Sequence, residues 1–138
     1  MVSTLVTQTV VDYRRAIDFL ETRPEIDSHR VAALGYSMGG HMVFILGAIE
    51  PRIKVAVASV VPETKGMQIE ASTFASRLGH LPLLMLMADK DEFYTKEEAQ
   101  GLYAAIPGKN KSITFYNSGH SLPGRYVEDA VKWIGDKL

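Results

Sequence analysis

Apolar residues along this chain recur with two spacings, one typical of helices and one typical of strands. From about Ser3 to Arg23 they recur at steps of four and three, which predicts an amphipathic helix that ends before Pro24. Three short apolar runs and one alternating run follow, and each has the length of a strand. We predict strands at 31–34, 53–61, 83–87 and 112–116, and helices at 42–49, 71–78, 95–106 and 124–137.

The same spacing predicts which side chains face the core. In the first helix the inward stripe consists of Val6, Val10, Tyr13, Ile17 and Leu20. In the last helix it consists of Val127, Ala130, Val131 and Ile134. Thr95 followed by Glu98 predicts a capping box at the start of the third of the four later helices.

Strands that alternate with helices predict a parallel sheet with helices on both faces. The predicted class is therefore α/β, with about four strands in a single domain over residues 1–138. Polar residues alternate with Ile113 and Phe115 in the last strand, which is typical of a half-exposed strand at the edge of the sheet.

Composition and charge narrow the classes of function. A net charge of −1, with both signs mixed along the chain, gives no electrostatic reason to expect nucleic acid or an anionic membrane as partner. The absence of cysteine excludes a disulfide framework, a thiolate metal site and a cysteine nucleophile, and it fits a cytoplasmic location. No signal peptide and no membrane span are expected from the apolar runs.

Residues 35–39 read Gly-Tyr-Ser-Met-Gly, a G-x-S-x-G motif between a predicted strand and a predicted helix. That context is typical of a sharp turn that exposes the serine at the start of a helix. Side chains at Gly35 and Gly39 are expected to collide with neighbouring backbone, and the free N–H groups of the helix favour an oxyanion. We therefore predict Ser37 as a nucleophile, the alternative being a glycine-rich turn with an incidental serine.

A serine nucleophile of this kind needs a carboxylate and then a histidine later in the chain. Of the four histidines, His120 lies in a loop of small residues after the fourth strand, at the sheet edge where open α/β proteins bind ligands. His80 precedes the third strand, and we interpret His41 as structural or as lining the pocket. The loop after the third strand offers the carboxylates of Asp89, Asp91 and Glu92, and position alone leaves the choice open.

The chain resembles the α/β-hydrolase superfamily, in particular its branch of dienelactone-hydrolase-like proteins and small bacterial serine esterases. The matching segments are 12–20, Arg30 with the strand after it, 35–40, 81–84, the Asp91 loop and 119–120. In that family the third of these strands ends in glycine and the acid follows three residues later. Ala88 holds the position of that glycine, so the resemblance implies Asp91 as the acid and Asp89 as the alternative.

The resemblance covers only the later four strands of a fold that has about eight, so it implies a truncated α/β-hydrolase. The family's loop that supplies a second oxyanion donor is missing, which leaves the Met38 N–H as the one expected donor. Because such a donor contributes about 10²–10³ in turnover, an unrepaired hole would give a poor catalyst. The strand at Val31–Leu34 would also lack a neighbour, so we expect a homodimer or larger homo-oligomer that covers this edge and contributes to the oxyanion hole.

These observations predict a serine esterase that needs no cofactor or metal. Ser37 would attack the ester carbonyl, His120 would move the proton and Asp91 would orient the imidazole. The connection between the second and third strands is too short for a large lid, which favours small molecules with short acyl chains as substrates. The alternative is a truncated hydrolase without useful catalysis, acting as a binding or assembly module or forming part of a longer protein.

Overall fold

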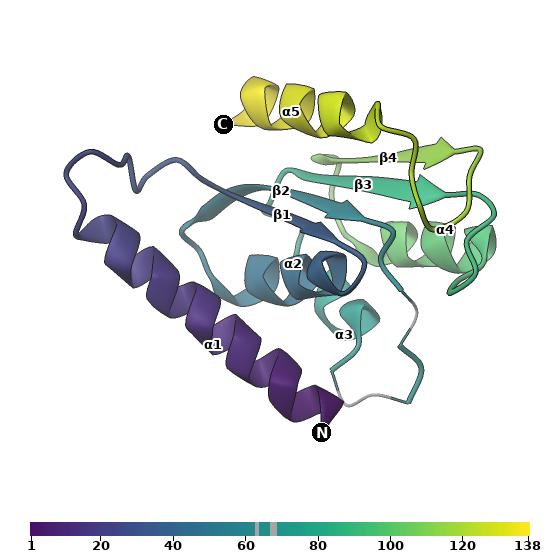
Figure 1. Ribbon diagram of the computed structural model, residues 1–138, viewed down its shortest axis with the longest axis horizontal. Coiled ribbons are helices and arrows are strands. Elements are labelled where there is room, and N and C mark those ends of the chain that lie inside the picture. The colour runs from purple at the N-terminus through teal and green to yellow at the C-terminus, as the bar shows by residue number, and fades with distance from the viewer. Residues whose placement is uncertain (63, 67–68) are drawn as a thin grey trace.

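The computed structural model describes residues 1–62, 64–66 and 69–138. After the first helix, strands and helices alternate along the chain (Figure 1). The bounds are α1 Val2–Glu21, β1 Val31–Tyr36, α2 Met38–Ile49, β2 Ile53–Ser59, α3 Ala71–Ala75, β3 Leu83–Ala88, α4 Lys96–Ala105, β4 Lys111–Tyr116 and α5 Tyr126–Lys137.

The four strands form one sheet in the order β1-β2-β3-β4, and every neighbouring pair is parallel. Helices α1 to α4 lie on one face of this sheet and α5 on the other (Figure 1). The predicted α/β class with helices on both faces is therefore confirmed. β3 is buried along its whole length, and β4 is the half-exposed edge strand that its alternating pattern predicts.

Local sequence explains where most elements begin and end. α4 begins with the predicted capping box, in which the Glu98 N–H donates to Thr95 Oγ1 at 3.1 Å and the Thr95 N–H donates to Glu98 Oε2 at 2.9 Å. α2 begins at Met38, earlier than predicted, because the turn at Ser37 passes directly into the helix. α3 is shorter than predicted and ends at Ala75. The connection predicted to be too short for a large lid includes residues 63, 67 and 68, which lie outside the described residues.

The inward face of α5 agrees with the prediction at Ala130 and Ile134 but not at Val127 and Val131. Val127 and Val131 are 49% and 65% exposed, whereas Ala130 is buried. Tyr126 and Trp133 pack beside Ala130 against β2 and β3 instead. Two apolar stripes fit the helical period of this segment, and the one that carries the aromatic rings covers the sheet because large rings bury the most apolar surface.

One edge of the sheet is open. β1 pairs with β2 on one side, and no strand within the described ranges pairs with it on the other. A groove of about 490 Å³ runs along this edge between α1 and α2, lined among others by Tyr13, Leu20, Leu34 and Met42. Tyr13 was predicted to face the core but is 55% exposed, because its stripe on α1 borders this groove.

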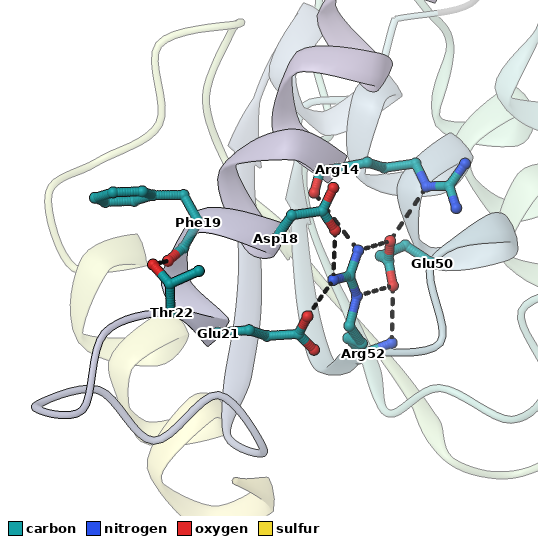
Figure 2. A network of polar contacts seen from close by, with 7 residues as sticks. All are labelled: Arg14, Asp18, Phe19, Glu21, Thr22, Glu50 and Arg52. Carbon is teal, nitrogen blue, oxygen red and sulfur yellow. Dashed lines mark hydrogen bonds and ion pairs between the residues drawn. The ribbon is translucent and has the colours of Figure 1, made fainter.

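A network of ion pairs fastens α1 to the turn between α2 and β2 (Figure 2). Arg52 donates to both oxygens of Glu50 at 2.7 Å, and Nε of Arg14 on α1 donates to Glu50 Oε2 at 3.2 Å. The same guanidinium reaches Asp18 at 2.7 Å and Glu21 at 3.0 Å, both on α1. No helix within the described ranges combines the length and the apolar character needed to cross a bilayer.

Candidate active site

The parallel register brings three loops together at one edge of the sheet. Tyr36 at the end of β1 lies beside Ser59 of β2, and Ala88 at the end of β3 lies beside Tyr116 of β4. The chain leaves each strand at this carboxyl edge, where open α/β sheets form their ligand sites. The loops that carry Ser37, Asp91 and His120 therefore start side by side.

Ser37 lies on a strained turn between β1 and α2. Its φ of 56° and ψ of −118° lie in a region that residues other than glycine rarely adopt. Its N–H donates to Ser59 O at 2.9 Å. A Cβ at Gly35 would lie 2.0 Å from Gly39 O, so glycine is required there. The turn holds the serine hydroxyl above the end of the sheet.

The second glycine that the turn requires is not the predicted one. A Cβ at Gly39 would meet nothing within 4 Å, which contradicts the expectation of a collision at that position. A Cβ at Gly40 would lie 2.8 Å from Ser59 O, because α2 passes close to the end of β2. The two positions at which neighbouring backbone lies too close for a side chain are therefore Gly35 and Gly40.

The three predicted side chains form a continuous chain of hydrogen bonds. The Ser37 hydroxyl lies 2.9 Å from His120 Nε2, and His120 Nδ1 lies 2.8 Å from Asp91 Oδ2 and 3.1 Å from Oδ1. Because a carboxylate only accepts, Nδ1 carries the proton and Nε2 is free to accept from Ser37. The Asp91 side chain is fully buried and the His120 side chain is 22% exposed. Such an arrangement can remove the proton from a serine hydroxyl as it attacks an acyl carbon.

The other two carboxylates of the loop after β3 contact backbone N–H groups. Asp89 Oδ1 accepts from the Ser118 N–H at 3.2 Å, and Glu92 Oε2 accepts from the His120 N–H at 3.0 Å. Among the described residues, the carboxylate that bonds to the imidazole of His120 is that of Asp91. The geometry therefore places Asp91, and not Asp89, on the histidine.

Two aromatic residues of this loop surround the Asp91–His120 pair. The ring of Phe93 meets the His120 ring edge-on at a centroid distance of 4.7 Å and is 61% exposed at the mouth of the site. The Tyr94 hydroxyl is buried and accepts from the Ala88 N–H at 2.9 Å. Burial raises the pKa of the Tyr94 hydroxyl well above its ordinary value, and the neighbouring Asp91 carboxylate adds to the rise. Sequence reasoning missed both residues, although their place two and three residues after Asp91 was a usable signal.

The other histidines take no part in this chain of hydrogen bonds. His41 is fully buried on α2, where its Nε2–H donates to Ile69 O at 2.7 Å and Thr64 Oγ1 lies 3.5 Å from Nδ1. Burial lowers the pKa of His41, so it stays neutral and ties the segment before α3 to α2. His80 precedes β3, at the opposite end of the sheet from Ser37.

The N–H of Met38 is the first of α2, and the first N–H groups of a helix have no acceptor within the helix. It lies directly after Ser37, which suits it to an oxyanion on a carbonyl attacked by the serine. Among the described residues, no group of three or more His, Cys, Asp or Glu side chains could hold a metal ion.

The chain is similar to hydrolases by sequence and by fold. Residues 1–132 match the model of the dienelactone hydrolase family. The chain is 38% identical over 47 residues to a thiohydrolase, apmlB, of Arthrinium phaeospermum, covering 34% of this chain and 15% of that protein. It is 36% identical over 67 residues to the esterase FrsA of Klebsiella pneumoniae, covering 49% of this chain and 16% of that one.

Among solved structures, a cold-adapted esterase from an Arctic intertidal metagenomic library superposes with a TM-score of 0.84. The two are 24% identical, and the match covers 96% of this chain and 59% of the esterase chain. At this level of identity the likeness shows the fold alone. The chain spans only part of each of these proteins. Because the family's model covers almost all of its residues, the chain belongs to the dienelactone hydrolase family.

Proposed function

We propose that the protein is a serine carboxylester hydrolase that acts on short-chain acyl esters. Ser37 Oγ attacks the ester carbonyl while His120 Nε2 takes its proton, and the imidazolium then protonates the leaving alcohol. Water repeats the sequence on the acyl-enzyme to release the acid and regenerate Ser37. Asp91 holds the imidazole with its proton on Nδ1, and the Met38 N–H donates to the oxyanion.

The observation that carries this proposal is the unbroken hydrogen-bond chain from Ser37 through His120 to Asp91, with Nε2 free to accept at 2.9 Å. Its three members follow the ends of β1, β3 and β4, and they lie at least 29 residues apart in the chain. Membership of a hydrolase family supports the same reaction class. A structural hydrogen bond between a serine and a histidine has no need of the strained backbone at Ser37.

The site supports a small substrate. Phe93, which lies against the His120 ring, and Met38, which follows Ser37 in the chain, are 61% and 38% exposed. An open mouth of this kind holds few atoms of a substrate away from water, which favours short acyl chains. The name esterase that the Klebsiella pneumoniae relative carries agrees with an ester as the substrate class.

A second candidate function is a binding or assembly module with little catalysis. One observation favours it, the open edge of β1 among the described strands. The sequence prediction of the Met38 N–H as the one oxyanion donor points the same way. A homodimer that covers the β1 edge would also repair the site if it supplied a second donor. The dimer and a cytoplasmic location stay predictions. Light scattering at micromolar concentration tests the dimer, and a clean monomer would contradict it.

Hydrolysis of a short-chain nitrophenyl ester tests the proposed reaction. The Ser37→Ala variant should lose at least about 10³-fold in rate, because removal of the nucleophile of a triad abolishes the covalent route. Ser72→Ala is the matched control, since it removes a hydroxyl from an exposed position on α3. Equal rates for the wild type and Ser37→Ala, with both proteins folded, would reject the proposal and favour the module.

A further inference from the structure

The loop that carries His120 is held to the rest of the fold mainly by side chains. In the described part of the chain, no hydrogen bond between backbone groups fastens residues 119–122. The Tyr36 hydroxyl instead donates to His120 O at 2.6 Å and accepts from the Leu122 N–H at 2.9 Å. One hydroxyl therefore bridges two backbone groups on either side of Ser121.

Glu92 holds the same loop from its other side. Its Oε2 accepts from the His120 N–H at 3.0 Å. A Cβ at Gly119 would lie only 2.6 Å from its Oε1, so the glycine leaves room for this carboxylate. The backbone of His120 is thus held at its N–H by Glu92 and at its carbonyl by Tyr36. The imidazole is held separately by Asp91.

Unlike Glu92, Tyr36 is the last residue of β1 and directly precedes Ser37. Its hydroxyl therefore fastens the histidine loop to the residue beside the nucleophile. Any movement of the end of β1 carries Ser37 and the backbone of His120 together. The contact therefore ties the position of the His120 backbone to the residue next to Ser37.

We infer that Tyr36 is a positioning residue, which keeps His120 Nε2 within reach of Ser37 through its hydrogen bonds to the His120 carbonyl and the Leu122 N–H. The inference rests on the proposed hydrolase function and adds a residue to its machinery. A displacement of about 1 Å of a reacting group costs up to about 10²-fold in rate. The hydroxyl thus affects the chemical step, while substrate binding depends on other groups.

The contribution of the hydroxyl can be separated from that of the ring. The Tyr36 ring packs against Tyr126 at a centroid distance of 5.4 Å and lies 6.0 Å from the His120 ring. Phenylalanine preserves these ring contacts and removes only the two hydrogen bonds. Since Tyr36 is 36% exposed, water can reach the groups that lose their partner, so the variant should fold.

The test compares Tyr36→Phe with Tyr103→Phe. Tyr103 lies on α4, and its hydroxyl also donates to a backbone carbonyl, Lys111 O, at 3.3 Å, in a region away from Ser37. Tyr36→Phe should lower kcat for the nitrophenyl ester by about ten- to a hundredfold and change KM less than about twofold. Tyr103→Phe should keep both constants near the wild-type values.

A second readout does not depend on turnover. The proton NMR signal of the imidazole Nδ1–H that is donated to Asp91 should be sharp in the wild type and broadened or lost in Tyr36→Phe. It should persist in Ser37→Ala and in Tyr103→Phe. If the wild type lacks esterase activity, the proposed function fails, and this signal still decides whether Tyr36 positions His120.

Three results would overturn the inference. One is a folded Tyr36→Phe variant whose kcat equals that of the wild type. Another is an imidazole signal that is unchanged by the substitution. The third is a loss of activity in Tyr103→Phe as large as that in Tyr36→Phe, since the effect would then come from general destabilisation.

Discussion

Two buried carboxylates join distant parts of this chain, Asp91 at one end of the sheet and Glu50 at the other. Their side chains are 0% and 1% exposed, and each accepts hydrogen bonds from a basic side chain at 2.7 to 2.8 Å. Asp91 faces His120, whereas Glu50 faces Arg52 and Arg14. Burial and distance are thus nearly the same, and the partner is what differs.

The partner decides what each carboxylate can do. An imidazole gains and loses a proton near neutral pH, so the Asp91–His120 pair can take up the proton of Ser37. A guanidinium keeps its charge at every pH at which the protein is folded, so the Glu50–Arg52 pair can only hold chain segments together. Hydrogen bonds from Arg52 lower the pKa of Glu50 to about 2. The comparison predicts that damage at Asp91 reduces rate and that damage at Glu50 reduces stability.

Asp91→Asn should give the largest effect. The asparagine amide donates toward His120 Nδ1, which moves the imidazole proton to Nε2 and leaves no acceptor for Ser37. We expect kcat to fall about 10⁴-fold, as in serine proteases with the equivalent change. Steady-state ester hydrolysis measures it. Asp89→Asn is the control, because Asp89 lies in the same loop but accepts from the Ser118 N–H. Its kcat should stay close to that of the wild type. Equal losses in both variants would contradict the assignment of Asp91.

Glu50→Gln should reverse that pattern. The amide cannot neutralise Arg52, and its NH₂ group faces a donor, so the pair loses its buried charged member while Arg52 keeps some contact with water. Breaking such a pair costs about 3 kcal/mol in the free energy of unfolding, while kcat of the folded fraction should remain near that of the wild type. Urea denaturation followed by circular dichroism measures the change. A stability within about 1 kcal/mol of the wild type would mean that the pair acts like an exposed one.

The free energy of unfolding below about pH 5 should depend on pH through Glu50. Its pKa is about 2 in the folded protein and 4.5 when unperturbed, so the unfolded chain binds more protons between these values. The stabilisation is therefore complete above about pH 5 and is lost as the pH falls toward 2, by about 3 kcal/mol in total. Urea denaturation at a series of pH values tests this. Glu50→Gln should lack this part of the slope, and an unchanged slope would assign it to other carboxylates.

Asp18→Asn should have the smallest effect. Asp18 also accepts from Arg52 at 2.7 Å, but its side chain is 64% exposed. Exposed pairs are screened by water and salt, so we expect a loss below about 1 kcal/mol that shrinks as salt is added. The same denaturation measurement applies, with Asp12→Asn on the exposed face of α1 as the reference. A loss as large as that in Glu50→Gln would show that burial does not distinguish the two partners of Arg52.

Sequence reasoning named the three side chains that the structure brings into contact, because each follows a strand at the carboxyl edge of a parallel sheet. Ser37 has a motif and His120 has its place after β4, whereas the choice of Asp91 over Asp89 came from family spacing. The roles of Tyr36 and Glu50 left no such signal. Tyr36 bonds to His120, 84 residues away, and Glu50 bonds to Arg14 on α1, 36 residues away, and neither spacing follows a period. The error at Val127 and Val131 arose because two helical stripes fit the same segment.

The two edges of the sheet differ in a way that affects how the protein is handled. β4 carries Lys111, and a charged side chain of this kind is one feature with which edge strands resist the addition of another strand. β1 has no charged residue between Val31 and Tyr36, and nothing among them prevents a further strand from pairing. The predicted dimer across β1 would make the state of association depend on protein concentration. Rates per molecule at nanomolar and micromolar enzyme should therefore be compared before any variant is ranked.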